Sequence, residues 1–333
     1  MDKTKINSKS VVNFLLNNAI IMILVLMVIY VGFTQNNFFS WNNVMNTASN
    51  VAVRLIVALG VSGCLITKGT DLSAGRIVGL GACIAATLLQ KMDYSGKYLT
   101  WLHIELPILV VLLITVGVCC IFGLANGAIV SFLKVPPFIA TLGMQTAVYG
   151  ICMVYTKATP LGNFRQSFIN VASGKLFGTI PYLFIYAFII GSIIWFLYNK
   201  TRHGKYMYAI GGNENAAEVS GVNVNKAKMI IYTLAAALYA IAGFLLAAKS
   251  GGATVNYGQG YELEAIAACT IGGVSTNGGV GRVSGILIGV LVFELLKTSL
   301  QFLGVETNYT YIVQGVVIII AVALDIRKYI SKK

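Results

Sequence analysis

The chain has 333 residues, of which 57% are hydrophobic and only 11% are charged. A typical soluble domain has about a quarter charged residues, so these side chains are too few to cover a water-facing surface. The composition therefore indicates an integral membrane protein. The net charge of +13 argues for membrane orientation rather than nucleic-acid binding, because Lys and Arg gather in short connections between apolar blocks.

About ten apolar blocks are long enough, or nearly so, to cross roughly 30 Å of hydrocarbon. The block after Lys3, Lys5 and Lys9 resembles a signal peptide, but it is long enough to span and lacks a small-residue cleavage site, so we expect a retained helix. The two weakest blocks, the third and the eighth, are short or rich in Gly. The expected spans are 14–33, 49–68, 75–91, 106–131, 138–156, 182–199, 229–248, 262–280, 283–303 and 309–326.

The positions of Lys and Arg orient these spans. If both termini are cytoplasmic, most of the 24 Lys and Arg fall on the cytoplasmic side, and the outward connections near 92–105, 157–181 and 249–261 carry fewer. The sequence therefore predicts an all-α membrane protein, N-in and C-in, forming one polytopic domain over residues 1–333.

Two polar stretches interrupt the apolar pattern, at 68–76 and at 272–282. Each contains Gly-Arg-x-x-Gly, at 75–79 and 281–285, and an apolar helix follows. We interpret them as a weak internal repeat around 69–79 and 275–285, of the kind found in transporters built from related halves. A broken helix beside a translocation path and a plain cytoplasmic turn are both open alternatives.

Glycines recur three or four residues apart inside the spans, as in Gly123 and Gly127 or Gly285 and Gly289. Each such pair shares one helix face, where small residues let backbones approach closely. We expect these faces to be packing seams.

Few ionisable residues lie inside the spans. Glu294 and Lys297 are three residues apart on one helix and could pair, which would neutralise both. Arg54, Glu262 and Glu264 are expected near span ends, where long side chains reach the interface. No chain of Asp, Glu and His crosses the bilayer, which argues against proton-driven transport.

Uncharged polar groups in or beside the spans are candidates for a translocation path. They are Asn46, Asn126 and Gln145, to which the first polar stretch adds Asp71 and Ser73. The alternative for the amides is hydrogen bonding between neighbouring helices.

The longest polar interval, residues 200–228, contains a short helix with both ends marked. Asn213 is a good N-cap, Glu214 and Glu218 place negative charge towards the helix start, and Gly221 suits the left-handed residue after the end. A two-turn helix between basic flanks and two spans is typical of an element gripped by a partner. An ordinary solvated loop with a turn of helix is the alternative.

Several chemistries lack their motifs. The chain has no G-x-x-x-x-G-K-[ST] loop for nucleotide phosphates, no G-x-S-x-G and no H-E-x-x-H. The six cysteines all lie in apolar runs without C-x-x-C or a His cluster, so we expect small buried side chains rather than metal or disulfide chemistry. Catalysis by this chain is not expected.

Five blocks in order resemble the membrane permeases of bacterial ABC sugar importers in the ribose, xylose and galactose group. The likeness runs from about residue 40 to residue 325, and GTDLSAGR, YELEAIAAC and the run KMDYSGK at 91–97 point to the galactose and methyl-galactoside branch. The blocks are GTDLSAGR (69–76), GLANG (123–127), PPFIATLG (136–143), AIGGNENAAEVSGVNV (209–224) and YELEAIAACTIGGVSTNGGVG (261–281).

The resemblance implies a permease of the bacterial cytoplasmic membrane that forms a homodimer. It implies as partners a cytoplasmic ATPase, which binds ATP and Mg, and a periplasmic or lipid-anchored sugar-binding protein, while this chain itself binds no cofactor or metal. The helix near 213–221 corresponds to the coupling helix that sits in a groove of the ATPase, and its residues are Gly212, Asn213, Glu214, Ala216, Ala217, Glu218, Val219, Ser220 and Gly221.

Two rival functions remain from the sequence. A secondary transporter or facilitator acting alone would carry its solute without an ATPase. An intramembrane enzyme would turn over substrate as the lone chain, although no paired catalytic residues support it.

Overall fold

The computed structural model describes residues 19–330, and its regular secondary structure is almost entirely helical, as expected. One two-stranded antiparallel hairpin, β1 (Lys175–Leu176) and β2 (Ile180–Pro181), interrupts the helices. The expected span at 14–33 begins outside the described residues. The helices, in order, are α2 (Ala19–Thr34), α3 (Trp41–Ile66), α4 (Ala74–Leu88), α5 (Ile108–Ser131), α6 (Pro137–Thr156), α7 (Gln166–Ser173), α8 (Tyr182–Lys200), α9 (Arg202–Gly212), α10 (Glu214–Val219), α11 (Val224–Ser250), α12 (Tyr261–Ile271), α13 (Val283–Phe302) and α14 (Thr307–Ile330).

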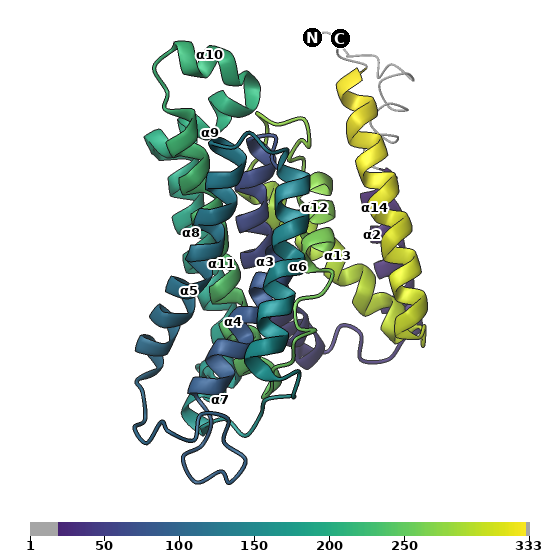
Figure 1. Ribbon diagram of the computed structural model, residues 1–333. Helices are drawn as coiled ribbons and strands as arrows, with labels where there is room; N and C mark the ends of the chain where they lie inside the picture. Colours follow the sequence, from purple (N-terminus) through teal and green to yellow (C-terminus); the bar gives the residue numbers. More distant parts are fainter. Residues whose placement is uncertain (1–18, 331–333) are drawn as a thin grey trace.

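Helix α11 runs through the centre of the bundle and packs against α3, α4 and α5 (Figure 1). Glycine makes the α5 contact close. A Cβ on Gly123 would lie 2.5 Å from the Ala236 Cβ, and one on Gly127 would lie 2.7 Å from the Met229 Cα. The expected seam on α5 is therefore confirmed as a packing face, because a larger side chain would force the two helices apart.

A second, smaller core joins α2, α13 and α14. Leu24, Val292 and Leu296 are buried there, with Val313 and Val317 packed against them. In Figure 1 the α2 and α14 helices stand beside the main bundle. The chain thus builds one large core around α3 and α11 and a lateral one at its two ends.

Six of the described helices are long and apolar enough to cross a membrane: α3, α5, α6, α8, α11 and α13. Shorter apolar helices of the described chain are 22–34, 74–88 and 307–323, in α2, α4 and α14. The all-helical expectation is confirmed, while the expected total of about ten spans remains a prediction.

Two boundaries differ most from those expected, and two short helices are additional. Helix α3 begins at Trp41 rather than 49, because the Ser40 Oγ accepts the backbone N–H of Asn43 and caps the start. The expected span at 262–280 is a helix only to Ile271, and Gly273, Gly278 and Gly279 then take positive φ angles in a loop. The short helices α7 and α9 were not expected, since both are too short to span a membrane and mix polar with apolar residues.

Helix α10 lies at one end of the bundle (Figure 1). The described chain enters α2 and leaves α14 at this same end, which we name the α10 end (Figure 1). The hairpin, α7 and the 89–107 segment lie at the opposite end, which we name the far end.

Candidate functional site

The α10 end carries two short helices that project beyond the bundle. Thr201 separates α8 from α9, and its Oγ1 accepts the backbone N–H of Gly204 at 3.4 Å. Helix α9 then runs to Gly212, where Asn213 turns the chain into α10. Thr201 as an N-cap is the one sequence signal for α9, but a Thr followed by such a segment is too common to predict a helix on its own.

Both ends of α10 are capped as the sequence predicts. The Asn213 Oδ1 accepts the N–H of Ala216 at 3.0 Å. At the other end Gly221, with φ of +87°, donates to the Glu218 carbonyl and Val222 donates to the Ala217 carbonyl. This pair of hydrogen bonds around a left-handed residue is the Schellman motif, and Gly takes the left-handed conformation without the penalty that a Cβ brings.

Helix α10 presents nearly all of its surface to the outside. Only Ala217 is buried, in a small core with Ile210, Val224 and Ala227. Val219 is 90% exposed, and Glu218 and Ser220 beside it are exposed as well. These three residues form the outward surface of the C-terminal half of α10.

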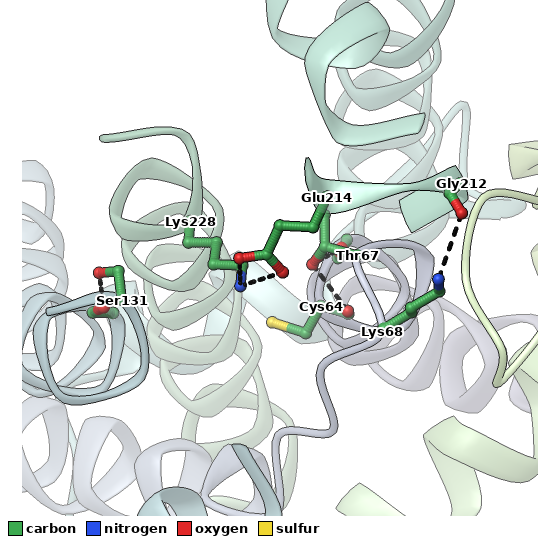
Figure 2. Close-up of polar contacts among 9 residues, drawn as sticks. Cys64, Thr67, Lys68, Ser131, Gly212, Glu214 and Lys228 are labelled. Atoms are coloured by element: carbon green, nitrogen blue, oxygen red, sulfur yellow. Dashed lines mark hydrogen bonds and ion pairs between the residues drawn. The ribbon is translucent and has the colours of Figure 1, made fainter. Parts of the chain in front are cut away.

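Two lysines tie the start of α10 to the bundle. The Lys228 Nζ donates to both carboxylate oxygens of Glu214, at 2.7 and 2.8 Å, and the Lys68 Nζ donates to the Gly212 carbonyl at 3.2 Å. Figure 2 shows the two side chains reaching the helix start from different elements, α11 and the segment after α3. Because both contacts flank Asn213, the cap is held at a fixed position against the bundle.

Helix α9 rests directly on the end of α3. A Cβ on Gly211 would meet the Ile66 carbonyl oxygen, and the Gly279 N–H donates to that same oxygen at 2.8 Å. The Tyr208 hydroxyl donates to the Gly281 carbonyl at 2.9 Å. Helix α9 therefore contacts the second polar stretch, 272–282, as well as the end of α3.

Burial changes the pKa of two side chains of α9. Burial raises the pKa of Tyr208, which keeps its hydroxyl protonated as a donor to Gly281. Burial lowers the pKa of His203 below its usual range, so the positive charge of this surface comes from Lys and Arg.

The first polar stretch enters the bundle instead of forming a surface turn. Asp71 is 1% exposed and Ser73 and Asn126 are 0% exposed. The Asp71 Oδ1 accepts from the Ser73 N–H at 3.0 Å and from the Ser73 Oγ–H at 2.6 Å, and the Asn126 Nδ2 donates to the Ser73 Oγ at 2.9 Å. Three of the residues proposed for a path are therefore joined in one network, which connects the start of α4 to α5.

The other two candidates lie apart from this network. Gln145 on α6 is half-buried, with its Nε2 3.5 Å from the Glu262 Oε1. Asn46 is exposed in the first turns of α3, at the far end. The structure thus groups Asp71, Ser73 and Asn126, with Gln145 on a neighbouring helix and Asn46 remote.

The expected pair of Glu294 with Lys297 is wrong. Glu294 instead forms an ion pair with Arg54, with 2.8 Å between the Arg54 Nε and the Glu294 Oε2, and Arg54 also pairs with Glu264. Arg54 is not near a span end either, because α3 begins eight residues earlier than expected (49 − 41 = 8) and places it in the middle of the helix. A contact across three helices leaves no local signal in the sequence.

All six cysteines are free, and five of them are buried. This agrees with the expectation of small apolar side chains at helix contacts.

Comparison with known proteins gives a consistent result. Residues 43–322 match the family described as branched-chain amino acid transport system / permease component. The galactose/methyl galactoside import permease of Escherichia coli is 44% identical over 98% of this chain and 99% of its own, and that of Haemophilus influenzae is 43% identical over 96% and 97%. The ribose import permease of Escherichia coli is 37% identical over 93% of both chains. No solved structure matches the chain.

Proposed function

The chain belongs to the permease family described as branched-chain amino acid transport system / permease component, and we propose that it is the translocation subunit of an ATP-driven importer of galactose and methyl galactosides. It is a multi-pass protein of the bacterial cytoplasmic membrane. The observation that carries the proposal is identity of 43–44% over nearly the whole chain to permeases named for that import.

The family description names amino acids, but the relatives favour a sugar. Relatives named for galactose/methyl galactoside reach 44% identity, and one named for ribose reaches 37%. Since both names specify sugars, a sugar is the solute we propose, with the hexose preferred to the pentose.

We propose that two copies of this chain form the path and that a separate ATPase supplies the energy. ATP and Mg are bound by that ATPase, and a periplasmic or lipid-anchored protein delivers the sugar. This chain is not an enzyme. The absence of a phosphate-binding loop in the sequence supports this division of labour.

In this proposal α10 is the coupling helix, with both chain termini and the α10 end in the cytoplasm. Its exposed residues Glu218 and Val219 contact the ATPase, while Ala217 faces its own chain. Movement of α10 passes through Gly211 to the end of α3 and through Gly279 to the segment before α13. Two discrete packings of such helices give alternating access.

The five residues proposed for the path divide by burial. Asp71, Ser73 and Asn126 are buried between α4 and α5. They can therefore line a path only in a second conformation, in which α5 moves away from α4. Gln145 and Asn46 are already accessible or partly so. This division predicts that the buried network opens during the transport cycle.

Reconstitution into liposomes tests the function. Radiolabelled galactose should accumulate inside vesicles that hold the permease and its ATPase, when ATP is supplied on the ATPase side and the loaded binding protein on the other. Omitting the ATPase should abolish uptake. The same omission addresses the rival role, because galactose flux through the chain alone would establish a facilitator and refute the importer.

A further inference from the structure

A cavity of about 720 Å³ opens among α3, α11, α12, α13, α14 and the segment 251–260 that connects α11 to α12. Helix α11 has 27 residues, which is about 40 Å at 1.5 Å per residue, and it runs from Val224 beside α10 to Ser250. Ser250 lines the cavity, so the cavity lies towards the far end. In the proposed orientation this is the outer side of the membrane.

The cavity wall is polar and aromatic. Asn256 and Gln259 are exposed on the connecting segment, and three tyrosines join them: Tyr257, Tyr261 and Tyr311. Two other hollows of the described chain, one along α6 and one between α3 and α8, are lined mainly by apolar side chains. Of these three surfaces, only this one offers many hydrogen-bonding groups together.

The floor of the cavity is an ion-pair cluster. Arg54 pairs with Glu264, and its Nε lies 2.8 Å from the Glu294 Oε2 behind it. The Arg54 guanidinium also lies 5.0 Å from the centre of the Tyr261 ring. Arg54 is 12 residues from Ile66 (66 − 54 = 12), about 18 Å along α3 from the α10 end of that helix, so the cavity reaches well into the bundle.

Lys297 stands at the wall of the cavity. It is half-buried, and among residues 19–330 it makes no hydrogen bond or ion pair. A half-buried ammonium group has a strong need for acceptors. Carboxylate acceptors on Glu264 and donors on Lys297 and Gln259 therefore surround one space.

This chemistry matches a sugar ring. A hydroxyl group donates and accepts hydrogen bonds, so it is served by a wall with both carboxylates and cations, and tyrosine rings cover the apolar face of such a ring. An apolar solute would leave these polar groups unsatisfied.

We propose that this cavity is a binding site for a sugar on its way through the permease, occupied after release from the binding protein. The inference rests on the proposed sugar import. It assigns Lys297 and Gln259 as groups that hydrogen-bond the sugar hydroxyls, with Tyr261 and Tyr311 as the ring contacts.

The test compares variants in the complete reconstituted importer, with galactose imported per ATP hydrolysed as the readout. Gln259→Ala and Lys297→Met should each lower this ratio about fivefold, the effect of losing one hydrogen bond worth about 1 kcal/mol. Lys297→Arg, which keeps the charge and a donor, should retain most of the ratio. Ser192→Ala removes an exposed hydroxyl in the apolar hollow that bonds only its own helix, so it should match the wild type.

Three results are decisive. A wild-type ratio in both Gln259→Ala and Lys297→Met would overturn the proposal. The proposal would also be overturned if the variants keep the wild-type ratio but need a higher concentration of binding protein for half-maximal ATP hydrolysis. That result would show that this wall is a docking surface for the binding protein. Absence of galactose uptake by the wild type would instead refute the proposed function itself.

Discussion

Single residues at the α10 end follow local rules of backbone chemistry. Asn213 accepts one N–H that the helix start leaves free, and Gly221 takes a φ of +87° that costs a residue with a Cβ about 1 to 2 kcal/mol. Both positions could be predicted from the sequence because each depends only on its neighbours in the chain. Arg54 could not, since its partners Glu264 and Glu294 come from α12 and α13.

The buried network at the start of α4 should respond to loss of one hydroxyl. Ser73→Ala removes the donor at 2.6 Å from Asp71 and leaves the Asn126 Nδ2 without its acceptor. We expect the free energy of unfolding to fall by about 1–3 kcal/mol, and the melting temperature of the purified protein in detergent to fall with it. Thr146→Val, at an exposed hydroxyl of α6 that bonds only its own helix, is the control and should melt as the wild type does. Equal melting of the two variants would contradict a structural role for the network.

The ion pair between Glu214 and Lys228 should act by holding α10 in place. Glu214→Lys leaves two like charges facing each other, so we expect sugar-stimulated ATP hydrolysis to fall about threefold or more, on the scale of a partly exposed pair worth up to about 1 kcal/mol. Glu214→Lys combined with Lys228→Glu restores opposite charges and should recover most of the activity. If the double variant is no better than the single one, the pair does not position the helix.

At the scale of elements, length decides which helices the sequence could identify. Long apolar helices such as α5 and α8 lie within two residues of their expected limits, because a continuous apolar run has few alternatives. Helix α12 ends at Ile271, because glycines after it take positive φ angles and form a loop that contacts Ile66 and Gly211. That loop depends on contacts far along the chain, which hydropathy does not contain.

Breaking α10 at its end should uncouple the importer. Gly221→Pro fixes φ near −65° where the chain needs +87°, and it removes the N–H donated to the Glu218 carbonyl. We expect galactose uptake and ATPase association to fall at least tenfold, while the amount of protein in the membrane is unchanged. Gly178→Pro creates the same conflict in the far-end hairpin, where φ is +72°, and should leave ATPase association intact. Normal uptake by Gly221→Pro would count against the coupling role.

At the scale of the whole molecule, one polypeptide connects an exposed helix at one end to a polar cavity at the other. The core around α3 and α11 joins them, because α3 carries Ile66 under α9 and Arg54 in the cavity floor. The sequence predicted the helical class and the short capped helix. It did not predict the cavity, whose wall combines residues from five helices, α3, α11, α12, α13 and α14, and from the segment before α12.

Site-specific labelling of α10 tests the central claim that this helix binds a cytoplasmic ATPase and moves with it. Val219→Cys is placed in a Cys120→Ser background, which removes the one native cysteine that is not buried. A membrane-impermeant maleimide should label Cys at this position from the cytoplasmic side only, and bound ATPase should protect it. Labelling from the external side, or labelling that the ATPase does not reduce, would contradict the account.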